Sequence, residues 1–175
     1  MTAAHSSLLI EEQPTITLCG IAANLLLNNN YFLATAESCT GGLIAAACTE
    51  LAGSSNWFER GLVTYSNAAK TELLGVDAEL IASSGAVSEP VVRAMAVGTL
   101  RHSHAHVSIA VTGVAGPGGG GADKPVGTVW FGFALPGGIT TEVQHFAGNR
   151  AAVRQATVQH ALTRLTELLQ METNI

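Results

Sequence analysis

The stretch YFLATAESCTGGLIAAACTEL, residues 31–51, decides the fold. Residues 31–36 are apolar and contain strand-forming side chains, which predicts a buried β-strand, and the alanine-rich residues 43–51 predict a helix. The six residues between them, Glu37 to Gly42, leave room only for a tight turn. A strand that turns directly into a helix is the building unit of α/β proteins, so this class is the prediction.

The same alternation of elements extends along the chain. A second unit is predicted from a strand at residues 61–65 and a helix from Asn67 to about Gly75, which places Lys70 in the first turns of that helix. Ser88 is expected to cap a helix that runs to about residue 100. Residues 107–111 then alternate between larger and smaller side chains, as a strand should.

A β-hairpin and a long helix complete the prediction. Residues 126–134 and 139–146 flank a Pro-Gly-Gly turn and predict an antiparallel hairpin. Asn149 is expected to cap the last helix, whose apolar stripe is Val158, Leu162, Leu165 and Leu169. Parallel strand–helix units combined with a hairpin imply a three-layer α/β/α sandwich with a mixed sheet and a β-hairpin in its C-terminal half.

Length and composition limit the class of protein. The chain has 175 residues, of which 47% are apolar, 12% are charged and 19 are glycine, which excludes a disordered chain and a coiled coil. Residues 1–13 are expected to form a flexible tail, followed by a first helix after Pro14 that ends in the asparagine run 28–30. Residues 14–175 show no linker or repeat and are expected to be one domain.

Charge and cysteine usage indicate partners and compartment. The formal charge of -5 and the scattered basic residues argue against a nucleic-acid partner. Three cysteines without C-x-x-C spacing favour neither a disulfide framework nor a zinc site, so a reducing cytoplasm is expected. The longest apolar run, residues 43–48, is far shorter than the roughly 20 residues of a membrane helix, so no membrane partner is expected.

Ser38 is the first candidate for chemistry. It follows a strand and precedes a helix, at the carboxyl end of the strand, where open α/β sheets bind ligands. Backbone N–H groups near Thr40, Gly41 and Gly42 would be available there to hold an oxyanion. The alternative is that Ser38 or Thr40 only caps the helix. The α/β-hydrolase motif G-x-S-x-G is absent, since Ala36 and Thr40 occupy its glycine positions.

A serine nucleophile needs a base, and Lys70 is the available candidate. None of the six histidines lies in the predicted turns at the strand ends. A lysine desolvated among apolar neighbours has a pKa below its usual value of about 10.4 and is able to take the serine proton. The alternative is a solvated lysine. Tyr65 would orient either group or merely cover the sheet, and Cys39 is a competing nucleophile.

The glycine-rich stretch from Thr112 to Gly121 is predicted to be a loop. Because backbone N–H groups approach an anion closely where no Cβ intervenes, this loop is either a phosphate or carboxylate cradle or a flexible surface loop. It matches neither the P-loop nor the dinucleotide fingerprint. His102, His104 and His106 form H-x-H-x-H, but no further ligand cluster is evident, so no metal site is expected.

Six motifs occur in an order that resembles the CinA C-terminal domain family. They are AESCTGG at 36–42, GSSNWFERG at 53–61, VTYSNAAK at 63–70, GAVSE at 85–89, TGVAGP at 112–117 and KPVGTV at 124–129. The resemblance covers roughly residues 15–170, and so long an ordered series is specific. It corresponds to the stand-alone form, since the length leaves no room for the molybdopterin-binding-like N-terminal domain of longer members.

The resemblance implies an activity and roles for these residues. The family's activity is hydrolysis of the carboxamide of nicotinamide mononucleotide to nicotinate mononucleotide and ammonia, in pyridine nucleotide recycling, without a cofactor. Ser38 would be the nucleophile, Lys70 its base and Tyr65 a supporting hydroxyl. Thr112 and Gly113 would line the site from the opposing loop. Beyond the resemblance, we expect backbone N–H groups near Thr40, Gly41 and Gly42 to stabilise the oxyanion and the loop from Gly116 to receive the phosphate, and Asn67 is a further expected substrate-binding residue.

Two further hypotheses stay open on the sequence. One is a nucleotide-binding or regulatory module without turnover, and the other is an amidase that acts on a different pyridine nucleotide or on a nucleoside without phosphate. The expected partner is a small-molecule nucleotide, and a homo-oligomer is expected, with a dimer favoured.

Overall fold

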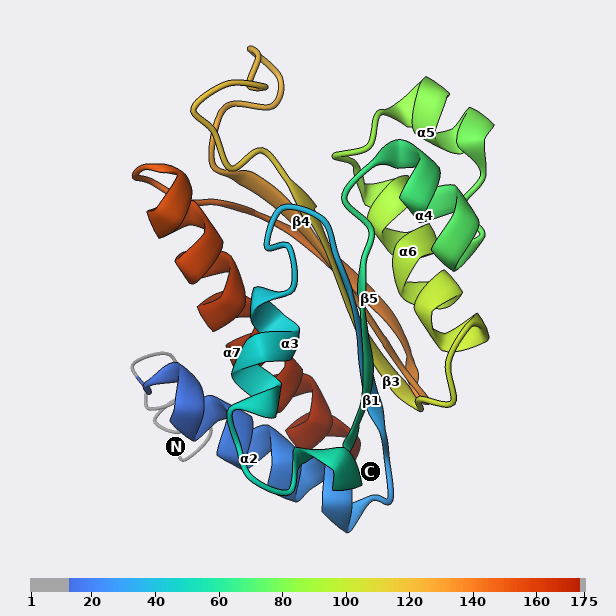
Figure 1. The fold of residues 1–175 in the computed structure, drawn as a ribbon, viewed down its shortest axis with the longest axis vertical. Helices are drawn as coiled ribbons and strands as arrows, with labels where there is room; N and C mark the ends of the chain where they lie inside the picture. Colours follow the sequence, from blue (N-terminus) through green and yellow to red (C-terminus); the bar gives the residue numbers. More distant parts are fainter. Residues whose placement is uncertain (1–12, 174–175) are drawn as a thin grey trace.

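The computed structural model describes residues 13–173, which form a sheet with helices on both sides (Figure 1). Only Gln13 of the expected N-terminal tail is among them. In chain order the elements are α2 (Thr15–Asn28), β1 (Leu33–Glu37), α3 (Leu43–Thr49), the 3₁₀ helix η1 (Ser54–Asn56), β2 (Phe58–Val63), α4 (Asn67–Leu74), α5 (Ala78–Ser84), α6 (Glu89–Arg101), β3 (Val107–Gly113), β4 (Thr128–Leu135), β5 (Gly138–His145) and α7 (Arg150–Thr173).

The strands form one mixed sheet in the order β2-β1-β3-β4-β5. β1 lies in the middle of a parallel set, paired with β2 on one side and β3 on the other. β4 runs antiparallel to β3 and forms a hairpin with β5. Parallel strands point their carboxyl ends to the same edge, so the residues that follow β1, β2 and β3 meet there.

Two layers of helices cover the sheet, as predicted (Figure 1). Helices α2, α3 and α7 pack on one face against large side chains that include Ile109, Phe131 and Phe133. Helices α4, α5 and α6 cover the other face, where the sheet presents small residues such as Ala110 and Ala134. The alternation along β3 and β4 therefore separates a larger core from a smaller one, and the three-layer α/β/α sandwich is confirmed.

Most predicted elements lie close to their expected bounds. The hairpin, the capping of α7 by Asn149, whose Oδ1 accepts from Ala152 N–H, and the burial of the α7 stripe are all confirmed. β2 begins at Phe58 instead of residue 61. Helix α5 was not predicted, because a seven-residue helix is too short to show a period.

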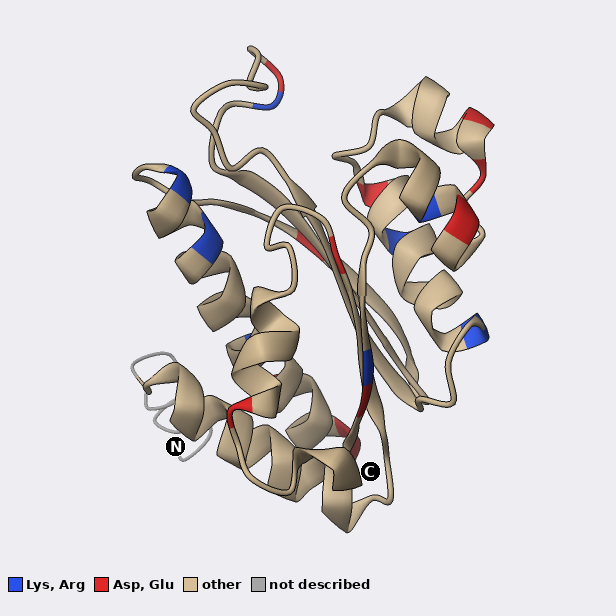
Figure 2. Cartoon of the chain, in the orientation of Figure 1, with Lys and Arg blue, Asp and Glu red and all other residues tan. Residues whose placement is uncertain are grey.

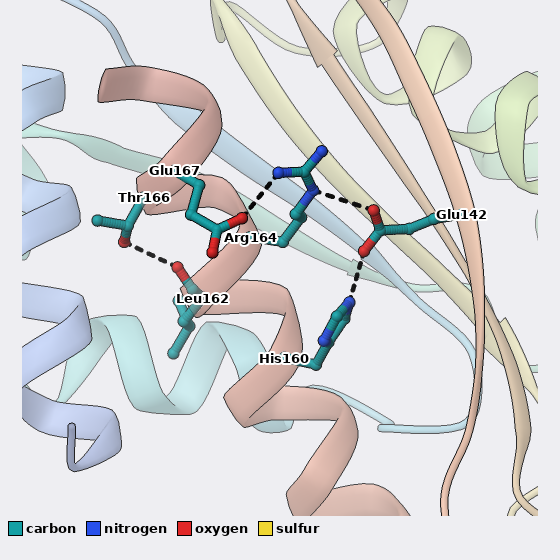
Figure 3. A network of polar contacts seen from close by, with 6 residues as sticks. All are labelled: Glu142, His160, Leu162, Arg164, Thr166 and Glu167. Atoms are coloured by element: carbon teal, nitrogen blue, oxygen red, sulfur yellow. Dashed lines mark hydrogen bonds and ion pairs between the residues drawn. The ribbon is translucent and has the colours of Figure 1, made fainter. Parts of the chain in front are cut away.

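A polar network fastens α7 to the edge strand β5 (Figure 3). The carboxylate of Glu142 on β5 accepts from His160 Nε2 and from Arg164 Nε, and Arg164 also donates to Glu167. The rings of Phe131 and Phe146 make edge-type contacts with the His160 ring. No helix within residues 13–173 is long and apolar enough to cross a membrane.

Candidate active site

The turn after β1 presents Ser38 at the edge where the parallel strands end. Gly41 and Gly42 have φ values of 59° and 100°, in the left-handed region that favours glycine. Ser38 N–H donates to Val111 O, 3.1 Å away, which ties the turn to β3. Neither Ser38 nor Thr40 caps α3 with its side chain, since Gly42 is the N-cap residue and no side-chain cap bond is made there.

Lys70 reaches this turn from α4. The helix is capped by the Ser66 hydroxyl, which accepts from Ala69 N–H, and it places Lys70 in its first turns, as predicted. The Lys70 side chain is only 1% exposed, which rules out the solvated alternative. Its Nζ lies 3.1 Å from Ser38 Oγ and 2.9 Å from Thr64 O. Burial lowers the pKa of Lys70 because desolvation penalises the ammonium form.

A cavity of about 230 Å³ opens beside the Ser38–Lys70 pair. It brings together six residues predicted for the site: Ser38, Tyr65, Asn67, Lys70, Thr112 and Gly113. It is also lined by five residues given no binding role from the sequence: Cys39, Ala86, Val87, Ala115 and Arg150. The Ser38 hydroxyl, the Lys70 amine and the Arg150 guanidinium therefore border one hollow at the carboxyl ends of the parallel strands.

Three predicted residues, Thr40, Gly41 and Gly42, pack behind Ser38 and do not line the cavity. Gly41 N–H donates to Ser38 O, and Gly42 N–H donates to Glu37 Oε2. Within the described part of the chain, the Thr40 N–H has no acceptor, and the Cys39 N–H has only the sulfur of its own side chain. Of the backbone donors in this turn, these two make no bond to another residue, and Cys39 is the one of the two that lines the cavity.

Cys39 does not compete with Ser38 as a nucleophile. Its side chain is buried, and desolvation by burial is the main reason that the pKa of its thiol is raised to about 11. A thiol with this pKa stays protonated at neutral pH, and the thiolate is the reactive form. The carbonyls of Cys39 and Thr40 accept from Arg154, which holds the turn against α7.

Arg150 lines the cavity and joins Tyr65 to the loop after β3. Its Nη2 donates to the Tyr65 hydroxyl at 2.8 Å and its Nη1 to Gly116 O at 3.1 Å. Tyr65 is 57% exposed and, among residues 13–173, bonds through its hydroxyl to Arg150 and to neither Ser38 nor Lys70. A second hollow of about 500 Å³ adjoins the first at Ala115 and Arg150, and Gly116 lines it.

The end of β3 and the loop after it are tied to the segment that joins α5 to α6, and the predicted loop begins after Gly113 because Thr112 and Gly113 still belong to β3. The Thr112 hydroxyl donates to Ala86 O at 2.9 Å, so it holds the loop before α6 in place. Lys124 Nζ similarly donates to Ser84 O at 3.2 Å. Two of the H-x-H-x-H residues bond to the backbone, since His102 Nδ1 contacts Gly98 O in its own helix and His106 Nδ1 accepts from the N–H of Phe32, which precedes β1.

Two residues of this region were missed from the sequence. Arg150 is in the first turn of a long helix, where the positive end of the helix dipole disfavours a cation. A cation at such an unfavourable position could have indicated a functional role from the sequence. Figure 2 shows basic residues in these first turns of α7 and few charges along the sheet. Glu37, a carboxylate at the end of a buried strand, was quoted in a motif but given no role.

Fold and site together define an α/β protein with a candidate serine–lysine catalytic centre. The sequence model of the CinA C-terminal domain matches residues 16–169. The nicotinamide-nucleotide amidohydrolase PncC of Enterobacter agglomerans is 57% identical over 141 residues, which are 79% of this chain and 86% of that protein. PncC of Escherichia coli strain K12 is 53% identical over 132 residues, 75% and 80% of the two chains. The chain belongs to the CinA C-terminal domain family, and the predicted resemblance is confirmed.

Solved structures agree with this assignment. A CinA superfamily protein of Klebsiella pneumoniae has a TM-score of 0.87 at 40% identity and covers 91% of this chain and 99% of its own. A competence/damage inducible protein of Agrobacterium tumefaciens has a TM-score of 0.86 at 43% identity and covers 89% and 96%.

Proposed function

We propose that this protein is an amidohydrolase that converts nicotinamide mononucleotide to nicotinate mononucleotide and ammonia, with Ser38 as nucleophile and Lys70 as base. The observation that carries the proposal is the 3.1 Å contact between Lys70 Nζ and Ser38 Oγ, made by a lysine buried away from water. The substrate is supported by the relatives, which are named nicotinamide-nucleotide amidohydrolases at 57% and 53% identity.

Lys70 acts first as the base. Lys70 Nζ donates to Thr64 O and lies 3.1 Å from Ser38 Oγ. In its neutral form the amine has a lone pair, which would accept the Ser38 O–H at this distance. Ser38 Oγ attacks the carboxamide carbon, its proton passes to Lys70 Nζ, and the carbonyl oxygen becomes an oxyanion. The N–H groups of Cys39 and Thr40 would stabilise this charge, since preformed backbone donors contribute strongly at such a position.

Lys70 then acts as the acid. Its ammonium gives the proton to the amide nitrogen, the C–N bond breaks, and ammonia leaves with the acyl group held as an ester of Ser38. A water molecule attacks the ester while Lys70 takes its proton, and Lys70 returns that proton to Ser38 Oγ as the ester bond breaks. One amide and one water are consumed, and one carboxylic acid and one ammonia are formed.

The phosphate of the substrate would lie toward the second hollow. Arg150 stands where the two hollows adjoin, and the first turn of α7 and the loop from Gly116 line the second one. A guanidinium and the positive end of a 24-residue helix both favour a dianionic group. The arrangement supports a nucleotide over its dephosphorylated nucleoside.

An ammonia-release assay tests the proposal. Purified wild-type protein is expected to release ammonia from nicotinamide mononucleotide, whereas Ser38→Ala should lose this activity while keeping its circular dichroism spectrum and thermal midpoint. The nicotinamide nucleoside without phosphate should be a much poorer substrate. Binding without ammonia release would indicate a regulatory module, and full activity in Ser38→Ala would exclude the covalent mechanism.

Compartment, pathway and assembly belong to the same proposal. We expect a cytoplasmic protein that acts in pyridine nucleotide recycling, and the cysteines Cys19, Cys39 and Cys48, all free and buried, are in keeping with a reducing compartment. A homodimer remains the expected assembly, and light scattering in solution checks it. Electrophoretic mobility shift with duplex DNA is expected to show no binding.

A further inference from the structure

Glu37 is the last residue of β1, directly before Ser38, and its carboxylate is fully buried. Oε2 accepts from the Thr40 hydroxyl at 2.6 Å and from the N–H groups of Gly42 and Ile44, both at 3.0 Å. Oε1 accepts from Ala45 N–H at 2.8 Å and from the Thr35 hydroxyl at 3.2 Å. One side chain therefore fixes both the turn that carries the nucleophile and the start of α3.

Close packing of α3 on the sheet makes these contacts possible. At Gly61 of β2, a Cβ would lie 2.7 Å from Ala45 Cβ and 3.1 Å from Thr35 Oγ1, so a side chain there would push the helix away. Without that side chain, the first N–H groups of α3 come within hydrogen-bond distance of Glu37. These are the donors that a helix start leaves unpaired, and a carboxylate is a favourable partner for them.

The backbone of Glu37 also reaches the base. Its carbonyl accepts from Thr64 N–H at 2.9 Å, and the Thr64 carbonyl accepts from Lys70 Nζ. The side chain of Glu37 thus holds the turn of Ser38, and its main chain holds the residue to which Lys70 is bound. A shift of β1 at Glu37 would move both groups of the pair.

We propose that Glu37 is the positioning residue of the catalytic pair: it fixes Ser38 and Lys70 in register and leaves the Cys39 and Thr40 N–H groups for the oxyanion. This inference rests on the proposed amide hydrolysis. The Glu37 carboxylate has five hydrogen-bond partners, two hydroxyls and three backbone N–H groups. All five donate, so both carboxylate oxygens have to accept. A glutamine would direct an NH₂ group at one set of donors, which disturbs the turn while keeping the volume.

The test compares Glu37→Gln with Glu142→Gln, a matched change in the half-buried network on β5, which is separated from β1 by the two strands β3 and β4. Ammonia release gives kcat and KM, thermal unfolding gives the folded fraction, and a fluorophosphonate probe reports the reactivity of Ser38 without any substrate. In Glu37→Gln we expect kcat per folded molecule to fall about 10²-fold with KM within about threefold, because misplacement by about 1 Å has an effect of this size. Labelling of Ser38 should slow in parallel, and Glu142→Gln should change neither.

A purely structural role would lower the folded fraction and leave kcat per folded molecule and the labelling rate within about threefold of wild type, and that result would overturn the proposal. An equal loss of kcat in Glu142→Gln would overturn it as well.

If Glu37→Gln does not fold, Thr40→Val removes one donor and keeps the carboxylate, and kcat should fall about tenfold. A wild-type protein that labels at Ser38 but releases no ammonia would refute the substrate, while the labelling comparison still decides the role of Glu37.

Discussion

Two glutamates, Glu37 and Glu142, each accept several hydrogen bonds, but their partners differ in kind. Glu37 is fully buried and bonded to hydroxyls and backbone N–H groups, with no cation among its hydrogen-bond partners in the described structure. The Glu142 side chain is 22% exposed and is bonded to the side chains of His160 and Arg164 (Figure 3). The Glu37 network joins β1 to α3, and the Glu142 network joins β5 to α7. Both helices cover the same face of the sheet.

The difference separates positioning from attachment. Backbone donors have fixed places, so the Glu37 network defines the geometry of the turn that carries Ser38, one member of the proposed catalytic pair. Long charged side chains adapt to small shifts, so the Glu142 network holds α7 to β5 without setting any position finely. We therefore expect changes around Glu37 to affect activity more than stability, and changes around Glu142 to do the reverse.

The largest effect is expected from Lys70→Arg. Arginine keeps the positive charge but does not lose its proton at any accessible pH, so it cannot act as the base. Ammonia release should fall by about 10³-fold or more, as for the loss of one member of a catalytic unit. The measurement is the steady-state assay at pH 8 on protein shown to be folded. Activity within tenfold of wild type would mean that Lys70 is not the base, and the distinction between the region around Glu37 and the region around Glu142 would then fail.

The pH dependence of wild-type activity should show the same lysine. Lys70 has to be neutral to act, and its pKa lies below the ordinary 10.5 because of burial. The value of kcat/KM should rise tenfold per pH unit and level off at the lowered pKa, hence below pH 10.5. A profile from pH 6 to 10.5 checks this, and the Glu142→Gln profile should superimpose on it. A rise that continues unchanged to pH 10.5 would contradict a shifted base.

Arg150→Ala should weaken substrate binding. A charge-assisted bond to phosphate contributes about 1.5–3 kcal/mol, so KM for nicotinamide mononucleotide should rise about tenfold to a hundredfold, with a smaller change for the nucleoside without phosphate. Arg93→Ala is the control, since Arg93 lies exposed on α6 and pairs with Glu89 outside the cavity. Equal effects on both substrates would show that Arg150 acts through Tyr65 and the loop, not through the phosphate.

The smallest effect concerns the stability of Glu142→Gln. Burial opposes ionisation of Glu142, but its hydrogen bond and ion pair with His160 and its contact with Arg164 outweigh this, so the pKa is lowered from 4.5. The carboxylate therefore stabilises the fold above pH 4.5, and this contribution is lost as the pH falls through the lowered pKa. We expect the variant to lose about 1–2 kcal/mol at pH 7 and progressively less below pH 4.5.

Urea unfolding of both proteins at pH 7 and in steps below pH 4.5 measures this difference. For a chain of this size, 1 kcal/mol corresponds to a shift of about 2–4 °C in the thermal midpoint. Activity at pH 7 is expected to stay within about threefold of wild type. A gap in stability that widens on acidification would contradict the sign of the pKa shift.

Sequence patterns predicted the layers of the fold because helical and strand periods are local properties. The turn at residues 38–42 was recognised for the same reason, since consecutive glycines signal a backbone that other residues avoid. Whether Lys70 was buried or solvated was not decided by the sequence, because burial depends on how α4 sits against β1 and on the distant residue Ser38. In the structure Lys70 is buried, and its Nζ contacts Ser38 Oγ and Thr64 O.

Partners that are far apart in sequence explain what was missed. Arg150 reaches Tyr65 and Gly116 from another part of the chain, and no local pattern encodes such a contact. Gly42 was predicted as an oxyanion donor from its place at a helix start, but its N–H already bonds to Glu37 five residues earlier. A helix start predicts free donors, and only the packed structure shows which of them remain free.

The sheet order described above also bears on how activity returns during refolding. The β4–β5 hairpin joins neighbours in sequence, so its strands pair after closing a short loop. The pairing of β1 with β3, by contrast, spans the chain from Leu33 to Val107 and encloses β2, the 3₁₀ helix η1 and the four helices α3 to α6. Such non-local parallel pairing forms slowly. Ser38 follows β1, Lys70 lies in the helix after β2, and Thr112 is near the end of β3. The site is therefore complete only when these parallel strands have paired. Enzymatic activity should recover with the last slow phase, after most of the helical signal has returned.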